Sequence, residues 1–249
     1  MTLRIPLIAI LILSQCFLLF AGQFLDGQRK YQRFKVAEKE KSAFIDSLFV
    51  RKGLQQKRSL VYLRVFKYNG QIELWARDRD RQNYQLIRTY EICAASGDLG
   101  PKRKMGDGQV PEGAYVVSAF NPVSNFYLSL GVSYPNQSDR ILGKGNNLGG
   151  SICIHGNCVT IGCIPIQDYY IKELYAICVY ARDNGQKAIP VHIFPARMDD
   201  AGMTYLSENY PDQALQKFWK NIRPFYLLFE QKRELPRISV DKKGNYIAE

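Results

Sequence analysis

The stretch from residue 151 to residue 165 constrains the fold most, because the chain must change direction twice within it. Isoleucines alternate with small residues over 151–154, which predicts a short buried strand. A Gly-Asn pair that begins at Gly156 then breaks the strand. Gly162 directly precedes Cys163, and glycine permits a backbone turn that other residues resist. The sequence therefore predicts that Cys163 lies on a constrained turn, between this strand and a helix that begins soon after it.

Cys163 on such a turn is suited to act as a nucleophile, provided that its thiol can be ionised. A free cysteine is only a few per cent thiolate at neutral pH, so a catalytic one needs a base or hydrogen-bond donors nearby. His155 lies eight positions earlier, and a tight loop can fold its ring back onto the sulfur. The backbone amides of Gly162 and Cys163 could stabilise a developing oxyanion. The pattern indicates a catalytic Cys–His pair.

Two other interpretations of the same residues stay open at this point. A single cysteine after a glycine is often a small buried apolar residue without chemistry. Cys153, His155, Cys158 and Cys163 could also bind zinc, although their spacing matches no familiar ligand pattern. In the first case Cys163 would be buried, or joined in a disulfide to Cys158 or Cys153, and the chain would be a binding module without activity.

The residues from His155 to Cys163 resemble the catalytic motif of the L,D-transpeptidase family, which has the YkuD-type fold. The motif has a His-Gly, a loop, and then Ser/Thr-x-Gly-Cys, and the short loop here resembles that of the YafK-like branch. Ile161 stands where the common pattern has a second histidine, and Pro165 stands where it often has arginine. The resemblance extends over residues 96–195 and includes the Gly-Asp-Leu-Gly-Pro-Lys-Arg and Pro-Glu-Gly runs that begin at Gly97 and Pro111.

The resemblance implies a mainly β, sandwich-like catalytic domain with flanking helices, which is α+β overall. It implies that Cys163 attacks a peptidoglycan stem peptide and forms a thioester, while His155 accepts and returns the proton. Gly162, Thr160 and Gly156 would support the oxyanion and the loop. An amine acceptor would give a cross-link or attach a protein. Water would give a carboxypeptidase, or an amidase that releases wall-bound lipoprotein. No metal or other cofactor is expected.

The net charge of +11 is compatible with nucleic acid, anionic lipid headgroups or an acidic cell-wall polymer. No nucleic-acid-binding motif is present, so the charge does not favour a nucleic acid partner. Two loops supply candidate substrate contacts: Lys102 and Arg103 could meet carboxylates, and Asp139 and Arg140 precede the motif.

The first 22 residues have the form of an export signal: a short basic lead and then an almost wholly apolar run. The run is short for a membrane-spanning helix, which needs about 20 apolar residues. We therefore expect an exported protein of the periplasm or cell envelope, with a cleaved signal or an N-terminal membrane anchor. If Cys16 is removed with the signal, five cysteines remain and at least one is unpaired.

The rest of the chain divides into three predicted regions: a basic helical arm over 23–58, the catalytic domain over 59–196, and an appendage over 197–249. Within the domain, two strand-like runs around Asn69-Gly70 predict a hairpin. The appendage is predicted to contain a helix that Pro224 breaks, and then a short hairpin. His192 alternates with apolar residues on a predicted core strand, which favours a structural or exposed histidine. Further strands are expected over 84–93, 113–120, 126–130 and 188–194, a mobile loop over 134–150, and a helix over 167–184.

Overall fold

The computed structural model describes residues 22–249. The predicted export signal lies almost entirely outside these described residues, so the structure does not bear on it. Among the helices of residues 22–249, none combines the length and the apolar character needed to cross a membrane.

An eight-stranded mixed sheet forms the centre of the protein, with the strand order β3-β2-β1-β8-β4-β5-β6-β7. The Asn-Gly turn joins β1 and β2 in the predicted antiparallel hairpin. The central strand β8 runs parallel to β1 and antiparallel to β4. At one edge, β5 pairs with β6 in the antiparallel sense, and β6 pairs with β7 in the parallel sense. The strands are β1 (Ser59–Phe66), β2 (Gln71–Asp78), β3 (Gln85–Glu91), β4 (Gly113–Asn121), β5 (Ser129–Val132), β6 (Cys153–His155), β7 (Ile164–Pro165) and β8 (Pro190–Phe194).

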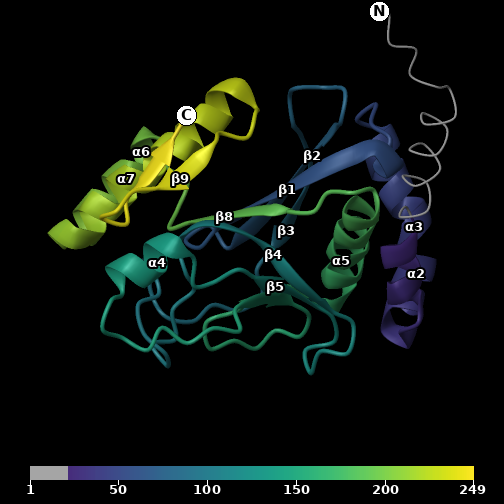
Figure 1. Ribbon diagram of the computed structural model, residues 1–249, viewed down its shortest axis with the longest axis horizontal. Helices are drawn as coiled ribbons and strands as arrows, with labels where there is room; N and C mark the ends of the chain where they lie inside the picture. The colour runs from purple at the N-terminus through teal and green to yellow at the C-terminus, as the bar shows by residue number, and fades with distance from the viewer. Residues whose placement is uncertain (1–21) are drawn as a thin grey trace, which may run out of the picture.

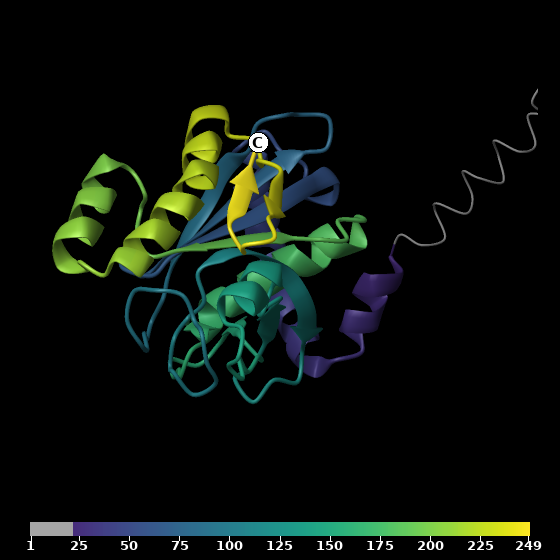
Figure 2. The ribbon, with the colours of Figure 1, turned by 60° about the vertical axis from the view of Figure 1, so that its left-hand side comes forward.

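Helices cover the sheet from two sides, as the expected α+β architecture requires (Figure 1). The N-terminal helices pack with α5 on one side, whereas α6, α7 and a small two-stranded sheet lie on the other (Figures 1 and 2). The elements are α2 (Gln23–Arg29), α3 (Gln32–Val50), the 3-10 helix η1 (Gln56–Arg58), α4 (Gln137–Leu142), α5 (Asp168–Asp183), α6 (Asp200–Asn209), α7 (Gln213–Lys232), β9 (Ile238–Val240) and β10 (Tyr246–Ala248).

The two sides of the sheet have separate hydrophobic cores. The larger core joins α3 and α5 to the strands, and it includes Phe34, Leu63 and Leu174. The second core joins α7 to the ends of β1 and β8 through Trp219 and Phe225. Burying each such large apolar side chain contributes about 1.5–3 kcal/mol. The β6–β7 edge, which carries His155, belongs to the larger core through Ile154 and Ile164.

Two sequence-based expectations were wrong. Pro224 lies inside α7 and does not break it, because the apolar face formed by Ile222, Phe225 and Phe229 is fully buried and holds the helix on either side of the proline. The segment predicted as a mobile loop over 134–150 contains α4, whose first turn is closed by a reciprocal capping box between Asn136 and Asp139.

The structural interpretation of His192 is confirmed. The ring is buried, and its Nδ1 lies 2.7 Å from the hydroxyl oxygen of Tyr62. Burial lowers the pKa of His192 to about 3, with a smaller contribution from the positive charge of Arg64. The ring therefore stays neutral at physiological pH and has a packing role in the second core.

Candidate active site

The last two strands of the sheet place Cys163 beside the end of β6. Ile164 pairs with Ile154, so Cys163 precedes β7 at the position next to Cys153. Gly162 makes the turn with φ at +131°, a value that favours glycine, and a Cβ there would lie 3.1 Å from the carbonyl oxygen of Gln109. The predicted constrained turn is present.

A disulfide holds the loop that leads into this turn. Cys158 is joined to Cys93, which follows β3 at the far edge of the sheet in strand order. This bond corrects two expectations: Cys158 is neither a zinc ligand nor the disulfide partner of Cys163. Cys153, Cys163 and Cys178 are the free cysteines of the described chain.

His155 is the last residue of β6, and a ring contact and a hydrogen bond fix its orientation. It is buried, and the ring of Phe126 lies against it with centroids 4.5 Å apart. Its Nδ1 bonds to the carbonyl oxygen of Gly156. Because a carbonyl can only accept, Nδ1 carries the proton and Nε2 keeps a free lone pair. His155 is therefore in the tautomer that can act as a base.

Cys163 and His155 lie close together. A ring nitrogen of His155 and the Sγ atoms of Cys153 and Cys163 all lie within 4.8 Å of one another. Cys163 is half-buried and lines a cavity, so a carbonyl group can approach its sulfur. The arrangement provides a thiol, a base with a free lone pair, and access from solvent.

The surroundings of Cys163 favour its thiolate form. Its pKa is lowered to about 5 by a hydrogen bond from the Cys153 thiol, with further contributions from His155 and from the backbone of Cys153, against an opposing effect of burial. The pKa of Cys153 is raised, first by its hydrogen bond to the neighbouring Cys163 sulfur and then by burial. Of the two sulfurs, these effects favour the thiolate at Cys163 and the thiol at Cys153.

Thr160 and Gly162, two of the loop residues predicted to support the site, bond to each other and to Cys163. The Gly162 amide has a different acceptor from the one expected. Thr160 Oγ1 donates to the carbonyl oxygen of Cys163 at 2.8 Å and accepts from the amide of Gly162 at 3.1 Å. The Gly162 amide is therefore already bonded, and it is not free to donate to an oxyanion in this structure. At Gly156 a Cβ would lie 2.5 Å from Oδ1 of Asp168 and 3.0 Å from the backbone oxygen of Phe126, so a larger residue would force these neighbours to shift.

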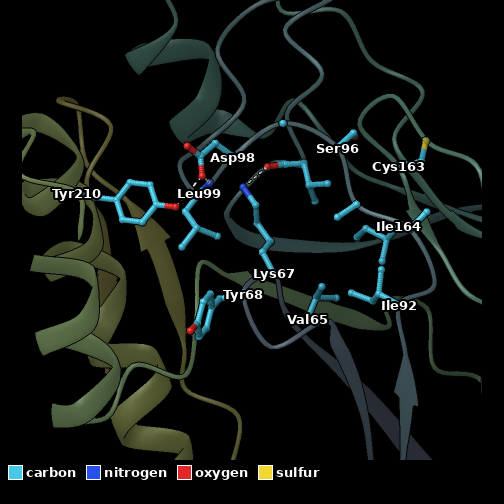
Figure 3. A pocket seen from close by; sticks show the side chains of 14 residues that line it. Val65, Lys67, Tyr68, Ile92, Ser96, Asp98, Leu99, Cys163, Ile164 and Tyr210 are labelled. Atoms are coloured by element: carbon cyan, nitrogen blue, oxygen red, sulfur yellow. Dashed lines mark hydrogen bonds between the residues drawn. The ribbon is translucent and has the colours of Figure 1, made fainter. Parts of the chain in front are cut away.

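A cavity of about 200 Å³ opens beside Cys163. Its wall next to the cysteine is apolar and includes Val65, Ile92 and Ile164 (Figure 3). Asp98 and Tyr210 lie at the opposite side of the cavity, where the tyrosine hydroxyl donates to the carboxylate at 2.7 Å (Figure 3). Sequence reasoning missed these two residues, because Tyr210 comes from a segment more than a hundred positions away in the chain.

The four predicted substrate contacts do not line this cavity, and their role toward a substrate stays a prediction. Lys102 and Asp139 are buried, and each has an ion-pair partner: Asp107 for Lys102, and Arg103 for Asp139. Arg103 also lies over the ring of Phe218. Arg140 is exposed on α4. The charges of Lys102, Arg103 and Asp139 stabilise the loop over 101–107 and α4, because their ion-pair partners come from these same segments.

Three donors remain of the four that could have held a metal ion. Cys153, His155 and Cys163 offer two sulfurs and one nitrogen, a set suited to soft ions, whereas Cys158 is oxidised. Structural zinc sites in proteins nearly always have four protein ligands. The described residues of this site therefore fall short of a closed structural zinc site.

Comparison with known proteins identifies the family. The family model of the L,D-transpeptidase catalytic domain, YkuD, matches residues 62–193. The protein named "Putative L,D-transpeptidase YafK" of Escherichia coli strain K12 is 36% identical over 192 residues, which are 76% of this chain and 74% of the relative. The same comparison holds for the protein of that name in Escherichia coli O157:H7.

Two solved structures resemble the fold at low sequence identity. The helical cell shape determining protein Pgp2 from Campylobacter jejuni has a TM-score of 0.45 and 17% identity, and the match covers 74% of this chain and 73% of that one. Bd1075 of Bdellovibrio bacteriovorus has a TM-score of 0.41 and 19% identity, over 76% of this chain and 79% of that one.

Proposed function

This chain belongs to the L,D-transpeptidase catalytic domain family, and we propose that it is a peptidoglycan L,D-transpeptidase whose nucleophile is Cys163. The observation that carries the proposal is the Cys163–His155 pair, with its donor atoms within 4.8 Å and the histidine held in the basic tautomer. As the family acts on the cell wall, its substrates are peptidoglycan stem peptides and its site of action is the cell envelope.

The first half-reaction forms a thioester. The Cys163 thiolate attacks the carbonyl carbon on the amino side of the bond to the terminal D-residue of a stem tetrapeptide. The tetrahedral intermediate collapses, the C–N bond breaks, and the terminal residue leaves as a free amine. His155, protonated at both nitrogens after it has taken the thiol proton, donates a proton to the leaving nitrogen.

The second half-reaction transfers the acyl group to an acceptor. The neutral His155 ring removes a proton from the acceptor amine as that nitrogen attacks the thioester carbonyl, and the Cys163 thiolate leaves. An amine of a second stem peptide yields a cross-link. Water in the same place would yield a trimmed stem peptide, and with a protein-bearing stem it would release the protein.

Mass spectrometry of purified muropeptides incubated with the wild-type chain and with Cys163→Ala tests this proposal. We expect cross-linked dimers with the wild type and none with the variant. Trimmed stem peptides without dimers would replace the transferase with a hydrolase on the same site. Equal product with both proteins would refute Cys163 as the nucleophile, and circular dichroism of the variant would first establish that it is folded.

A further inference from the structure

A second thiol lies directly beside the proposed nucleophile. The Sγ atoms of Cys153 and Cys163 are 3.5 Å apart, and neither residue is in a disulfide. Cys153 is the first residue of β6 and Cys163 directly precedes β7, so each lies one residue before the paired Ile154 and Ile164. The Cys153 thiol lowers the pKa of Cys163, but its sulfur takes no part in the thioester steps above.

The backbone at this place has the geometry of a disulfide site. Adjacent strands lie about 4.7–4.9 Å apart, and disulfides form between Cα atoms about 4.4–6.8 Å apart. The sulfurs must approach from 3.5 Å to about 2.05 Å, a movement that rotation of the two short side chains can supply. The β6–β7 pairing can therefore remain intact when the bond closes.

We propose that Cys153 is a resolving thiol, which forms a reversible disulfide with Cys163 when a hydroperoxide oxidises the nucleophile. The modification site is thus the Cys153–Cys163 pair itself. The disulfide would stop catalysis, because it consumes the sulfur that would attack the stem peptide. This consequence rests on the proposed function. The formation of the disulfide rests only on the geometry.

The chemistry balances with hydrogen peroxide as the oxidant. The Cys163 thiolate attacks one peroxide oxygen, an S–O bond forms, the O–O bond breaks, and the departing hydroxide takes a proton to become water. The Cys153 sulfur then attacks the Cys163 sulfenic acid, the S–S bond forms and the S–O bond breaks. The second hydroxide leaves with the Cys153 proton as water, so two thiols lose two electrons and one peroxide yields two waters. A dithiol reductant reverses the bond by thiol–disulfide exchange.

The order of the two steps follows from the surroundings of each sulfur. Cys163 has the lowered pKa and faces the cavity, and such cysteines are oxidised first. The pKa of Cys153 is raised chiefly by its hydrogen bond to the Cys163 sulfur. Once Cys163 is a neutral sulfenic acid, that thiolate charge is gone, and Cys153 ionises more readily. Cys178 is fully buried and is protected from the same oxidant.

Peptide mapping of the purified chain tests the proposal without an activity assay. Trypsin leaves Cys153, Cys158 and Cys163 in one fragment, residues 145–172, because the sequence has no lysine or arginine between 144 and 172. The Cys93–Cys158 disulfide holds this fragment to residues 89–102. After alkylation under denaturing, non-reducing conditions, we expect two alkyl groups on the linked fragments before peroxide treatment and none after it. Dithiothreitol under native conditions restores them.

Two variants complete the experiment. In Cys153→Ser, peroxide is expected to leave Cys163 as a sulfenic acid that dimedone traps, with no additional disulfide. In Cys178→Ala, the matched control, the result is expected to equal that of the wild type. Two alkyl groups that persist in the peroxide-treated wild type would overturn the proposal. So would a dimedone adduct on wild-type Cys163, or an extra disulfide in Cys153→Ser. None of these outcomes depends on whether the chain makes cross-links, so a failure of the proposed function is scored separately.

Discussion

Replacement of Cys153 by alanine tests whether this thiol stabilises the Cys163 thiolate. The change removes the S–H donor that lies 3.5 Å from the Cys163 sulfur and leaves the cavity and His155 in place. A hydrogen bond to a charged group contributes about 1.5–3 kcal/mol, and the thiol is a weak donor, so we take the lower value. Since about 1.4 kcal/mol corresponds to one pKa unit, the pKa of Cys163 should rise from about 5 to about 6.

The rate of iodoacetamide alkylation against pH measures this rise. At pH 5 the thiolate fraction of Cys163 should fall from about one half to about one tenth, a roughly fivefold slower alkylation, whereas above pH 8 the two proteins should react alike. Fragment-ion sequencing assigns the modification to Cys163 itself, because the tryptic fragment of residues 145–172 also contains Cys153.

Cys153→Ser is the matched control, because a serine hydroxyl keeps a donor at the same position. We expect its alkylation profile to stay near that of the wild type. If Cys153→Ala titrates like the wild type, or if Cys153→Ser shifts as far as alanine does, the Cys153 side chain is not the donor that lowers the Cys163 pKa. In that case His155 and the backbone would carry the effect.

Three further predictions concern the base and the supports of the site. His155→Gln should lower turnover of stem peptides by about 10²–10⁴-fold, as loss of a general base does, with its folding unchanged by circular dichroism. Gly156→Ala should destabilise the protein by about 1–3 kcal/mol in urea unfolding, because the new Cβ would lie 2.5 Å from Oδ1 of Asp168, and an unchanged midpoint would contradict this. The double variant Cys93→Ser/Cys158→Ser should be about 2–4 kcal/mol less stable than the oxidised wild type. If the difference persists when the variant and the wild type are compared under reductant, the disulfide is not its cause.

Short-range patterns predicted much of the fold. The Asn-Gly pair between two alternating apolar runs fixed the β1–β2 hairpin, because that turn is encoded within a few residues. The turn at Gly162 and the strand before His155 could be predicted for the same reason. Pro224 shows the limit of such reasoning: local propensity favours a break, but the buried face of α7 on the second core prevails.

The sequence likewise predicted only part of the candidate site. His155 and Cys163 are close in the sequence, so a single motif could place them. The ion pairs that bury Lys102 and Asp139 could not be foreseen, since their partners are determined by loop conformation in three dimensions. The same holds for the Asp98–Tyr210 hydrogen bond in the cavity, which joins a loop after β3 to the end of α6. Spacing along the chain carries no information about such pairs.

The two members of the proposed catalytic pair are held by different parts of the structure. His155 is a buried residue of a strand, and the β5–β6 pairing and the Phe126 ring fix it. Cys163 is half-buried on a turn, and Thr160 and the Cys93–Cys158 disulfide hold the loop that carries it. Perturbations of the loop should therefore displace the nucleophile and leave the base in place. Reduction of the Cys93–Cys158 bond should accordingly change the alkylation rate of Cys163. The NMR chemical shifts of the His155 ring should stay unchanged.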